Sequence, residues 1–200
     1  MRTLEKELIT QGYTHIVGVD EAGRGPLAGP VVAAAVMMPL AIELDHIVDS
    51  KKLSQRKREA SYAQLFKYGQ IGIGVASPQE IDTVNILQAT FLAMKRAIKN
   101  LPEPPDYCLI DGNLCIPDFS TKQQALVRGD ANHYLIAAAS IVAKVYRDRI
   151  MTDYHLEYPQ YGFDRHKGYP TKKHYSALDQ YGPSPIHRYS FQGVRRGIIS

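Results

Sequence analysis

The chain has 200 residues, of which 44% are hydrophobic and 22% charged. These proportions are typical of a globular domain and exclude intrinsic disorder, a collagen-like repeat and a disulfide-stapled miniprotein. The net charge of +4 is too small to identify a partner, so the distribution of the charges matters more than their sum.

The amino-terminal residues contain charged side chains where a signal peptide would need an apolar core, which predicts a cytoplasmic protein. The longest apolar run, residues 31–38, is far shorter than the roughly 20 residues of a membrane-spanning helix. Cys108 and Cys115 fit neither a disulfide framework nor a zinc-binding spacing, so both are expected to be ordinary free thiols.

Helical and strand patterns alternate through the first three quarters of the chain, which is typical of an α/β domain. Strands are predicted over residues 15–20, 30–38, 70–76, 107–111 and 124–127. A short helix is predicted that Thr3 can cap and that stops at Gly12, and a second one over residues 55–68 that Ser54 can cap. A third helix is predicted to begin with the capping box of Ser77, Pro78 and Glu80, and a long fourth one covers residues 131–155. The third of these helices would place Val84, Leu87, Phe91, Met94 and Ile98 on one apolar face.

After Tyr158 the sequence becomes rich in glycine and proline, which predicts a small appendage over residues 158–200 with one short helix that begins at Thr171. No linker long enough to mark a second domain is present, so residues 1–200 are predicted to form a single domain that includes this appendage. Residues 165–196 hold seven Lys or Arg against one acid, Asp179, together with several tyrosines. These residues could pad the appendage against the core or bind nucleic acid, with cations for phosphates and rings for sugars.

The sharpest local motif is residues 19–30, where two acids end a predicted strand and a glycine-rich turn follows. Asp20 and Glu21 reach one site only if the backbone turns there, because adjacent strand residues point to opposite faces. Gly23 and Gly25 permit such a turn. Alternatively, the acid pair faces solvent, or Gly23, Gly25 and Ala28 form a dinucleotide fingerprint, which the prolines and the following strand-like run disfavour.

Two further carboxylates follow predicted strand ends or precede the long helix, namely Asp111 and Asp130. In an α/β sheet, groups at the carboxyl ends of strands converge on one crevice, so four carboxylates could meet. Their mutual repulsion calls for neutralising cations, and oxygen ligands favour Mg²⁺ or Mn²⁺. Such a cluster suggests two-metal phosphoryl transfer.

Five blocks carry a resemblance to a known family, namely residues 19–32, 49–54, 109–113, 129–149 and 158–171. In order, and over nearly the whole chain, they resemble the signature blocks of bacterial ribonuclease HII. One departure, ANHYL after the aspartate of the fourth block, touches no expected ligand.

The resemblance implies a ribonuclease H-like α/β fold, a central mixed sheet flanked by helices with a small helical carboxyl-terminal appendage. It also implies an endoribonuclease that cuts the RNA strand of RNA–DNA hybrids and nicks 5′ of single ribonucleotides in duplex DNA, leaving 5′-phosphate and 3′-hydroxyl ends. Its role would be the removal of misincorporated ribonucleotides and RNA primers. The expected partners are these nucleic acids, without a membrane, and the expected state is a monomer.

Carried over residue by residue, the resemblance assigns the catalytic metal-binding set to Asp20, Glu21, Asp111 and Asp130, with two Mg²⁺ or Mn²⁺ ions. Gly23, Arg24 and Gly25 would form the GRG motif, whose backbone senses the ribose 2′-hydroxyl, and Tyr169 would pack on the sugar beyond the junction. Candidate phosphate contacts are Lys51, Lys52, Lys144, Arg147, Lys167, Lys172 and Lys173. Two other classes remain open, namely a non-catalytic nucleic-acid-binding module and a nucleotide-cofactor oxidoreductase.

Overall fold

The computed structural model describes residues 2–45, 47 and 53–195. Its centre is one mixed five-stranded sheet in the order β3-β2-β1-β4-β5. The strands are β1 (Ile16–Ala22), β2 (Val31–Met37), β3 (Gln70–Ala76), β4 (Tyr107–Asp111) and β5 (Lys122–Leu126). The first three strands pair antiparallel, whereas β1, β4 and β5 run parallel, so the carboxyl ends of β1 and β4 lie at the same edge.

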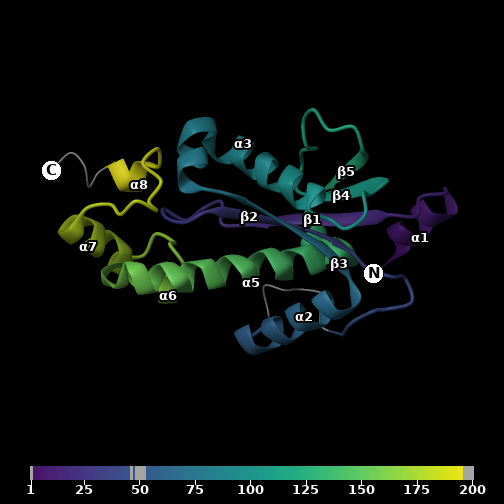
Figure 1. Ribbon diagram of the computed structural model, residues 1–200, viewed down its shortest axis with the longest axis horizontal. Helices are drawn as coiled ribbons and strands as arrows, with labels where there is room; N and C mark the ends of the chain where they lie inside the picture. Colours follow the sequence, from purple (N-terminus) through teal and green to yellow (C-terminus); the bar gives the residue numbers. More distant parts are fainter. Residues whose placement is uncertain (1, 46, 48–52, 196–200) are drawn as a thin grey trace.

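Helices cover both faces of the sheet, as Figure 1 shows. The helix α3 (Pro78–Lys99) packs on one face and α5 (Tyr134–Glu157) on the other, with α2 (Gln55–Tyr68) packed against α5. Alternate residues of β1 supply the two apolar cores, with Ile16 on the α5 side and Val17 and Val19 on the α3 side. Gly18 allows α5 to approach closely, because a Cβ there would lie 2.2 Å from the Leu135 carbonyl carbon.

Local sequence signals set several boundaries correctly. The observed α2, β3 and β4 have the predicted bounds. Ser54 caps α2 by accepting a hydrogen bond from the Lys57 N–H at 3.4 Å. The Ser77 and Glu80 capping box of α3 is present with both of its hydrogen bonds.

Other boundaries differ from the predictions. The helix α1 (Thr3–Thr10) is preceded by Arg2 and has no side-chain cap, so the Thr3 cap is wrong. The long helix is interrupted at the extended residue His133, which separates α4 (Gly129–Asn132) from α5. Asn85 has a φ of 69° and kinks α3, and Val84 just before it is 38% exposed instead of lining the apolar face.

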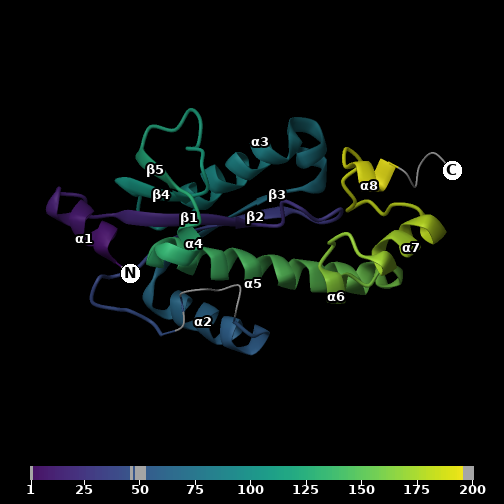
Figure 2. The same cartoon turned by 180° about the vertical axis from the view of Figure 1, so that it is seen from behind.

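The described part of the carboxyl-terminal appendage, residues 158–195, contains four short helices, of which only the one after Thr171 was predicted. They are η2 (Pro159–Tyr161), α6 (Phe163–His166), α7 (Lys172–Tyr181) and α8 (Gln192–Arg195). Both views place α7 and α8 at the end of the molecule opposite α1 (Figures 1 and 2). A third apolar cluster joins the appendage to Met151 of α5 and to Leu27 and Ala28 of the glycine-rich turn.

Cys108 is buried and Cys115 is exposed, and both are free thiols, as predicted. In the described part of the chain, no helix is both long enough and apolar enough to cross a membrane.

Candidate active site

The acid pair lies within β1, because the strand continues through Ala22 and pairs with β2 to that point. The backbone therefore does not turn between Asp20 and Glu21, and the two side chains leave opposite faces of β1. Asp20 is 5% exposed and shares the α5 side, where it forms a side-chain hydrogen bond with Ser140. Glu21 is on the α3 side and accepts a hydrogen bond from Arg24 Nη1 at 3.3 Å.

Two further carboxylates lie beside this end of β1. Asp111 is the last residue of β4, which runs parallel to β1. Its Oδ1 accepts a hydrogen bond from the Asp130 N–H at 3.3 Å. Asp130 lies in α4 and is 6% exposed, so the short helix before the break at His133 places it against the strand end. The structure thus brings the four predicted carboxylate residues to one edge of the sheet.

The electrostatics of this edge favour a neutralising cation. Burial raises the pKa of Asp20 well above its usual value, and the negative charges of Glu21 and Asp111 raise it further. Burial also raises the pKa of Glu21, while the Arg24 guanidinium opposes that rise. A bound cation would relieve both the desolvation and the repulsion of these carboxylates.

The donor set fits a hard divalent cation, since it offers only carboxylate oxygens. As placed, no three His, Cys, Asp or Glu side chains within residues 2–45, 47 and 53–195 form a group that could hold a metal ion. The period of the strand gives the reason, because it directs Asp20 and Glu21 to opposite faces of β1.

A hollow of about 400 Å³ opens next to the carboxylates. It is lined by Glu21, Ala22, Gly23, Arg24, Gly25, Arg58, Ser140, Lys144 and Tyr169. Gly25 and Tyr169 are neighbours in its lining, because a Cβ on Gly25 would be in van der Waals contact with the tyrosine Cε1 at 3.7 Å. The predicted GRG residues and Tyr169 therefore form one surface beside the acids.

The glycine-rich turn after β1 depends on glycine at one position in particular. Gly23 has a φ of +99°, in the left-handed region that favours glycine. A Cβ there would lie 2.0 Å from Arg147 Nε and 2.8 Å from the Pro30 carbonyl oxygen. Close packing against buried groups thus explains why a side chain is excluded at the first position of the motif.

Arg147 is buried and fully bonded within the protein, which argues against its predicted role as a phosphate contact. Its side chain is 1% exposed, and its guanidinium donates to the carbonyl oxygens of Pro30, Lys167 and Ala28 at 2.9, 3.0 and 3.1 Å. Every nitrogen of the guanidinium therefore has a backbone partner, and none faces solvent. The spacing of Lys144, Arg147 and Arg149 along α5 could not reveal this, because it does not tell which face of the helix the appendage covers.

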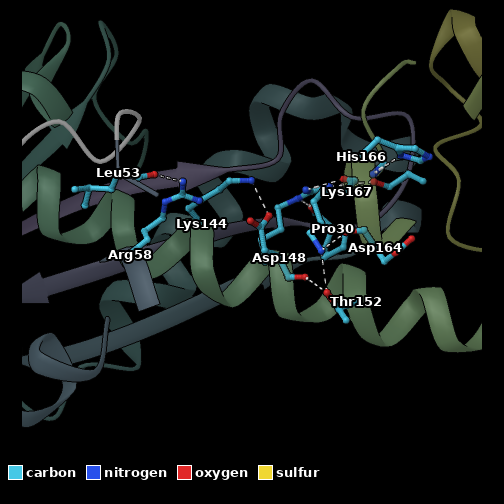
Figure 3. A network of polar contacts seen from close by, with 12 residues as sticks. Pro30, Leu53, Arg58, Lys144, Asp148, Thr152, Asp164, His166 and Lys167 are labelled. Atoms are coloured by element: carbon cyan, nitrogen blue, oxygen red, sulfur yellow. Dashed lines mark hydrogen bonds and ion pairs between the residues drawn. The ribbon is translucent and has the colours of Figure 1, made fainter. Parts of the chain in front are cut away.

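The remaining basic candidates differ in exposure and partners. Lys144 lines the hollow and forms an ion pair with Asp148 at 2.6 Å. Lys167 Nζ donates to Thr152 Oγ1 and to the Asp164 carbonyl oxygen, so it joins the appendage to α5 (Figure 3). Two further candidates are exposed in the first turn of α7, namely Lys172 and Lys173. Lys51 and Lys52 lie outside the described residues.

Three residues at the site were not singled out from the sequence. Ser140 bonds Asp20, Arg58 lines the hollow and donates to the Leu53 carbonyl oxygen, and Arg188 lies beneath the GRG turn. Figure 3 shows the bond from Arg58 beside the ion pair of Lys144. A polar residue on the apolar face of the predicted long helix could have indicated Ser140, whereas nothing local distinguished Arg58 or Arg188.

Comparisons with known proteins agree with this geometry. The family model described as "Ribonuclease HII" matches residues 17–194. A ribonuclease HII of Syntrophobacter fumaroxidans is 55% identical over 196 residues, which are 98% of this chain and 84% of the relative. The crystal structure of ribonuclease H2 from Pyrococcus horikoshii OT3 is similar with a TM-score of 0.76 at 26% identity, over 92% of this chain and 97% of that one.

A more distant structure, that of Bst-RNase HIII in complex with Mn²⁺, has a TM-score of 0.69 at 16% identity. It covers 94% of this chain and 70% of that chain, and the likeness concerns the fold. Together these similarities confirm the predicted α/β ribonuclease H-like fold.

Proposed function

The chain belongs to the ribonuclease HII family and is an endoribonuclease, and we propose that its carboxylate edge cuts the RNA strand of RNA–DNA hybrids and nicks duplex DNA 5′ of an embedded ribonucleotide. The observation that carries this proposal is the placement of Asp20, Glu21 and Asp111 beside a hollow lined by the GRG turn and Tyr169. The proposed cellular role is the removal of misincorporated ribonucleotides and RNA primers.

In this proposal, Asp20, Glu21, Asp111 and Asp130 hold two divalent cations, Mg²⁺ or Mn²⁺. The chemistry that such cations supply when bound is charge stabilisation of the attacking and leaving oxygens of phosphate. Water attacks the phosphorus and the bond to the 3′ oxygen breaks, which leaves a 3′-hydroxyl and a 5′-phosphate end. The carboxylates would hold the cations at the scissile phosphate, and Ser140 fixes the Asp20 side chain through its hydrogen bond.

Selection of RNA requires contact with the 2′-hydroxyl, since this group alone distinguishes the two sugars. We assign this contact to the backbone of Gly23, Arg24 and Gly25, which is exposed at its last two residues. Tyr169 is 43% exposed and lines the hollow next to Gly25, where it can pack on the following sugar. A deoxyribose is favoured there because an added hydroxyl would crowd the ring.

We further propose that the chain is a single catalytic domain in which residues 158–200 form a substrate-binding appendage. The described part of this segment supplies Tyr169 and the exposed Lys172 and Lys173. It also covers the end of α5 with its own apolar cluster, which would hold these groups in place on the duplex.

The test uses end-labelled duplex DNA with one ribonucleotide, an RNA–DNA hybrid and an all-DNA duplex, each with Mg²⁺, Mn²⁺ or EDTA. We expect a metal-dependent nick immediately 5′ of the ribonucleotide, cleavage of the hybrid and no cleavage of all-DNA duplex. Mapping of the cut at single-nucleotide resolution checks the position. Tight binding without a nick in either metal would contradict the proposal and leave a nucleic-acid-binding module.

A further inference from the structure

Arg188 is a fully buried arginine from the appendage whose guanidinium lies beneath the GRG turn. Its Nη2, Nη1 and Nε donate to the carbonyl oxygens of Gly23, Arg24 and Gly29 at 2.6, 2.9 and 2.9 Å. Burial of a charged group is costly unless its donors are satisfied, and here three carbonyl dipoles satisfy them. The planar fork of an arginine also fixes the directions of these bonds, which a lysine cannot do.

The backbone around Arg188 holds it in register with the turn. The Arg188 N–H donates to the Leu27 carbonyl oxygen at 2.9 Å, and the Gly29 N–H donates to the Ile186 carbonyl oxygen at 2.8 Å. The guanidinium carbon also lies 5.1 Å from the centre of the Phe191 ring. These contacts leave the side chain little freedom, so it serves as a rigid support for the turn.

The direction of the carbonyls determines the direction of the amides. In a trans peptide, the C=O of one residue and the N–H of the next lie in one plane and point in opposite directions. The described backbone contains no cis peptide bond. Because the Gly23 and Arg24 carbonyls point inward to Arg188, the N–H groups of Arg24 and Gly25 point outward, on the side where the hollow lies.

We propose that Arg188 is a specificity-determining positioning residue, which orients the peptides Gly23–Arg24 and Arg24–Gly25 so that their N–H groups donate to the ribose 2′-oxygen. This inference rests on the proposed function, because it takes the hollow as the ribose site. Arg147 supports the same turn at its other carbonyls, those of Ala28 and Pro30, and it provides a matched control.

The test combines one substitution in the protein with one in the substrate and compares kcat/KM for all four pairs. Each protein cuts a duplex with one ribonucleotide and the same duplex in which fluorine replaces the 2′-hydroxyl of that nucleotide. Fluorine is a poor hydrogen-bond acceptor, so the wild-type kcat/KM is expected to fall roughly tenfold or more. In Arg188→Lys the fluorine penalty should shrink to less than about threefold, because the amides no longer hold one direction.

The Arg147→Lys control also removes a buried fork, but the Arg147 guanidinium packs against Gly23 without a hydrogen bond to either of the two peptides in question. It should lose thermal stability as Arg188→Lys does while it keeps the full fluorine penalty. A general loss of folding lowers both rates equally and leaves the ratio unchanged. Equal penalties in wild type and Arg188→Lys, or a reduced penalty in both variants, would overturn the role of Arg188.

The wild-type protein offers a second measurement that does not depend on whether Arg188→Lys folds. The amides of Arg24 and Gly25 should exchange readily in the free protein and become protected on binding the ribonucleotide duplex, more than on binding all-DNA duplex. Protection already present in the free protein, or none in the complex, would overturn the orientation. A wild-type protein that does not nick at all refutes the proposed function, whereas a cutting enzyme with unchanged ratios refutes only this inference.

Discussion

At the scale of single residues, the charge of Asp20 is the least favourable feature of the free site. Its carboxylate is buried next to Glu21 and Asp111, and all three effects raise its pKa. A buried carboxylate near other negative charges lowers the stability of the folded protein, and carboxylates with such perturbed pKa values cluster at functional sites. Asp20 is therefore a candidate functional residue. The proposed purpose here is to hold divalent cations against the scissile phosphate.

Replacement of Asp20 by Asn should abolish cleavage while it leaves duplex binding intact or tighter. The amide is a weaker metal ligand, and its neutral form removes repulsion toward the phosphates. Cleavage under single-turnover conditions and equilibrium binding in EDTA measure the two effects separately. The control is Asp153→Asn, at an exposed aspartate of α5, which should retain wild-type values for both. Full activity of Asp20→Asn would contradict the metal site.

Replacement of Tyr169 by Ala should impair the cutting of single embedded ribonucleotides more than the cutting of long hybrids. The ring is expected to select a deoxyribose beyond the junction, and in a long hybrid that sugar is a ribose. The measurement is the ratio of kcat/KM for the two substrates. Tyr175→Ala is a suitable control, because Tyr175 is also exposed, at 40%, but lies outside the hollow. Equal losses on both substrates would make Tyr169 a packing residue.

At the scale of elements, the appendage is held by a directional chain of hydrogen bonds between histidines. The Ser184 N–H donates to His187 Nδ1 at 2.9 Å, so His187 carries its proton on Nε2. That nitrogen lies 3.0 Å from His174 Nε2, and His174 Nδ1 lies 3.0 Å from the Tyr169 carbonyl oxygen, which can only accept. The Ser184 N–H and the Tyr169 carbonyl therefore require both imidazole rings to be neutral, each in one tautomer. This series of hydrogen bonds ends on the backbone of Tyr169.

The hydrogen bonds of His174 and His187 predict that the protein loses stability in mild acid. Burial lowers the pKa of His174 to about 4 and that of His187 to about 3, whereas the usual value is 6.5. Between pH 6.5 and the pKa values in the folded protein, the two histidines bind protons in the unfolded chain but stay neutral in the folded protein. The free energy of unfolding therefore falls as the pH falls below about 6.5. Above that pH the two histidines contribute no dependence.

Each of the two histidines should remove about 1 kcal/mol of unfolding free energy between pH 6 and pH 5. Denaturant unfolding of wild type and of His187→Gln measures this, since glutamine can accept and donate but does not titrate in this range. Between pH 6 and pH 5, the unfolding free energy of the variant should fall by about 1 kcal/mol less than that of the wild type, which is the contribution of one histidine. His15→Gln, at an exposed histidine that pairs with Glu103, is the control. An identical slope in His187→Gln and wild type would show that the pair does not carry the effect.

At the scale of the whole molecule, the exposed basic groups near the hollow and on α7 should make binding strongly dependent on salt. Neutralisation of about six phosphates predicts that duplex affinity falls roughly 10³-fold between 50 and 200 mM salt. Fluorescence anisotropy over this range, with a non-cleavable all-DNA duplex, gives the slope. Lys172→Gln combined with Lys173→Gln should reduce it, whereas Arg147→Lys should not, because Arg147 is buried. A flat response would mean that the basic segment faces away from the duplex.

The sequence by itself determined the local elements and the family. The Ser54 and Ser77 caps act within one helical turn, and the alternation of β3 and the run of β4 are properties of five to seven residues, so the bounds of these elements were predictable. The acidic residues could be named in the same way, because each stands beside a recognisable strand end or helix start.

Only the tertiary structure decided which side chains meet. Helical spacing did not show whether Arg147 lies on a solvent-exposed or a covered face of α5, because the appendage that covers it comes from a later segment of the sequence. The pairing of β2 with β1 carries the strand past Glu21, which separates the two acids onto opposite faces. Arg188 reaches the Gly23 carbonyl from 165 positions away. Such contacts depend on packing between distant segments, which no local pattern encodes.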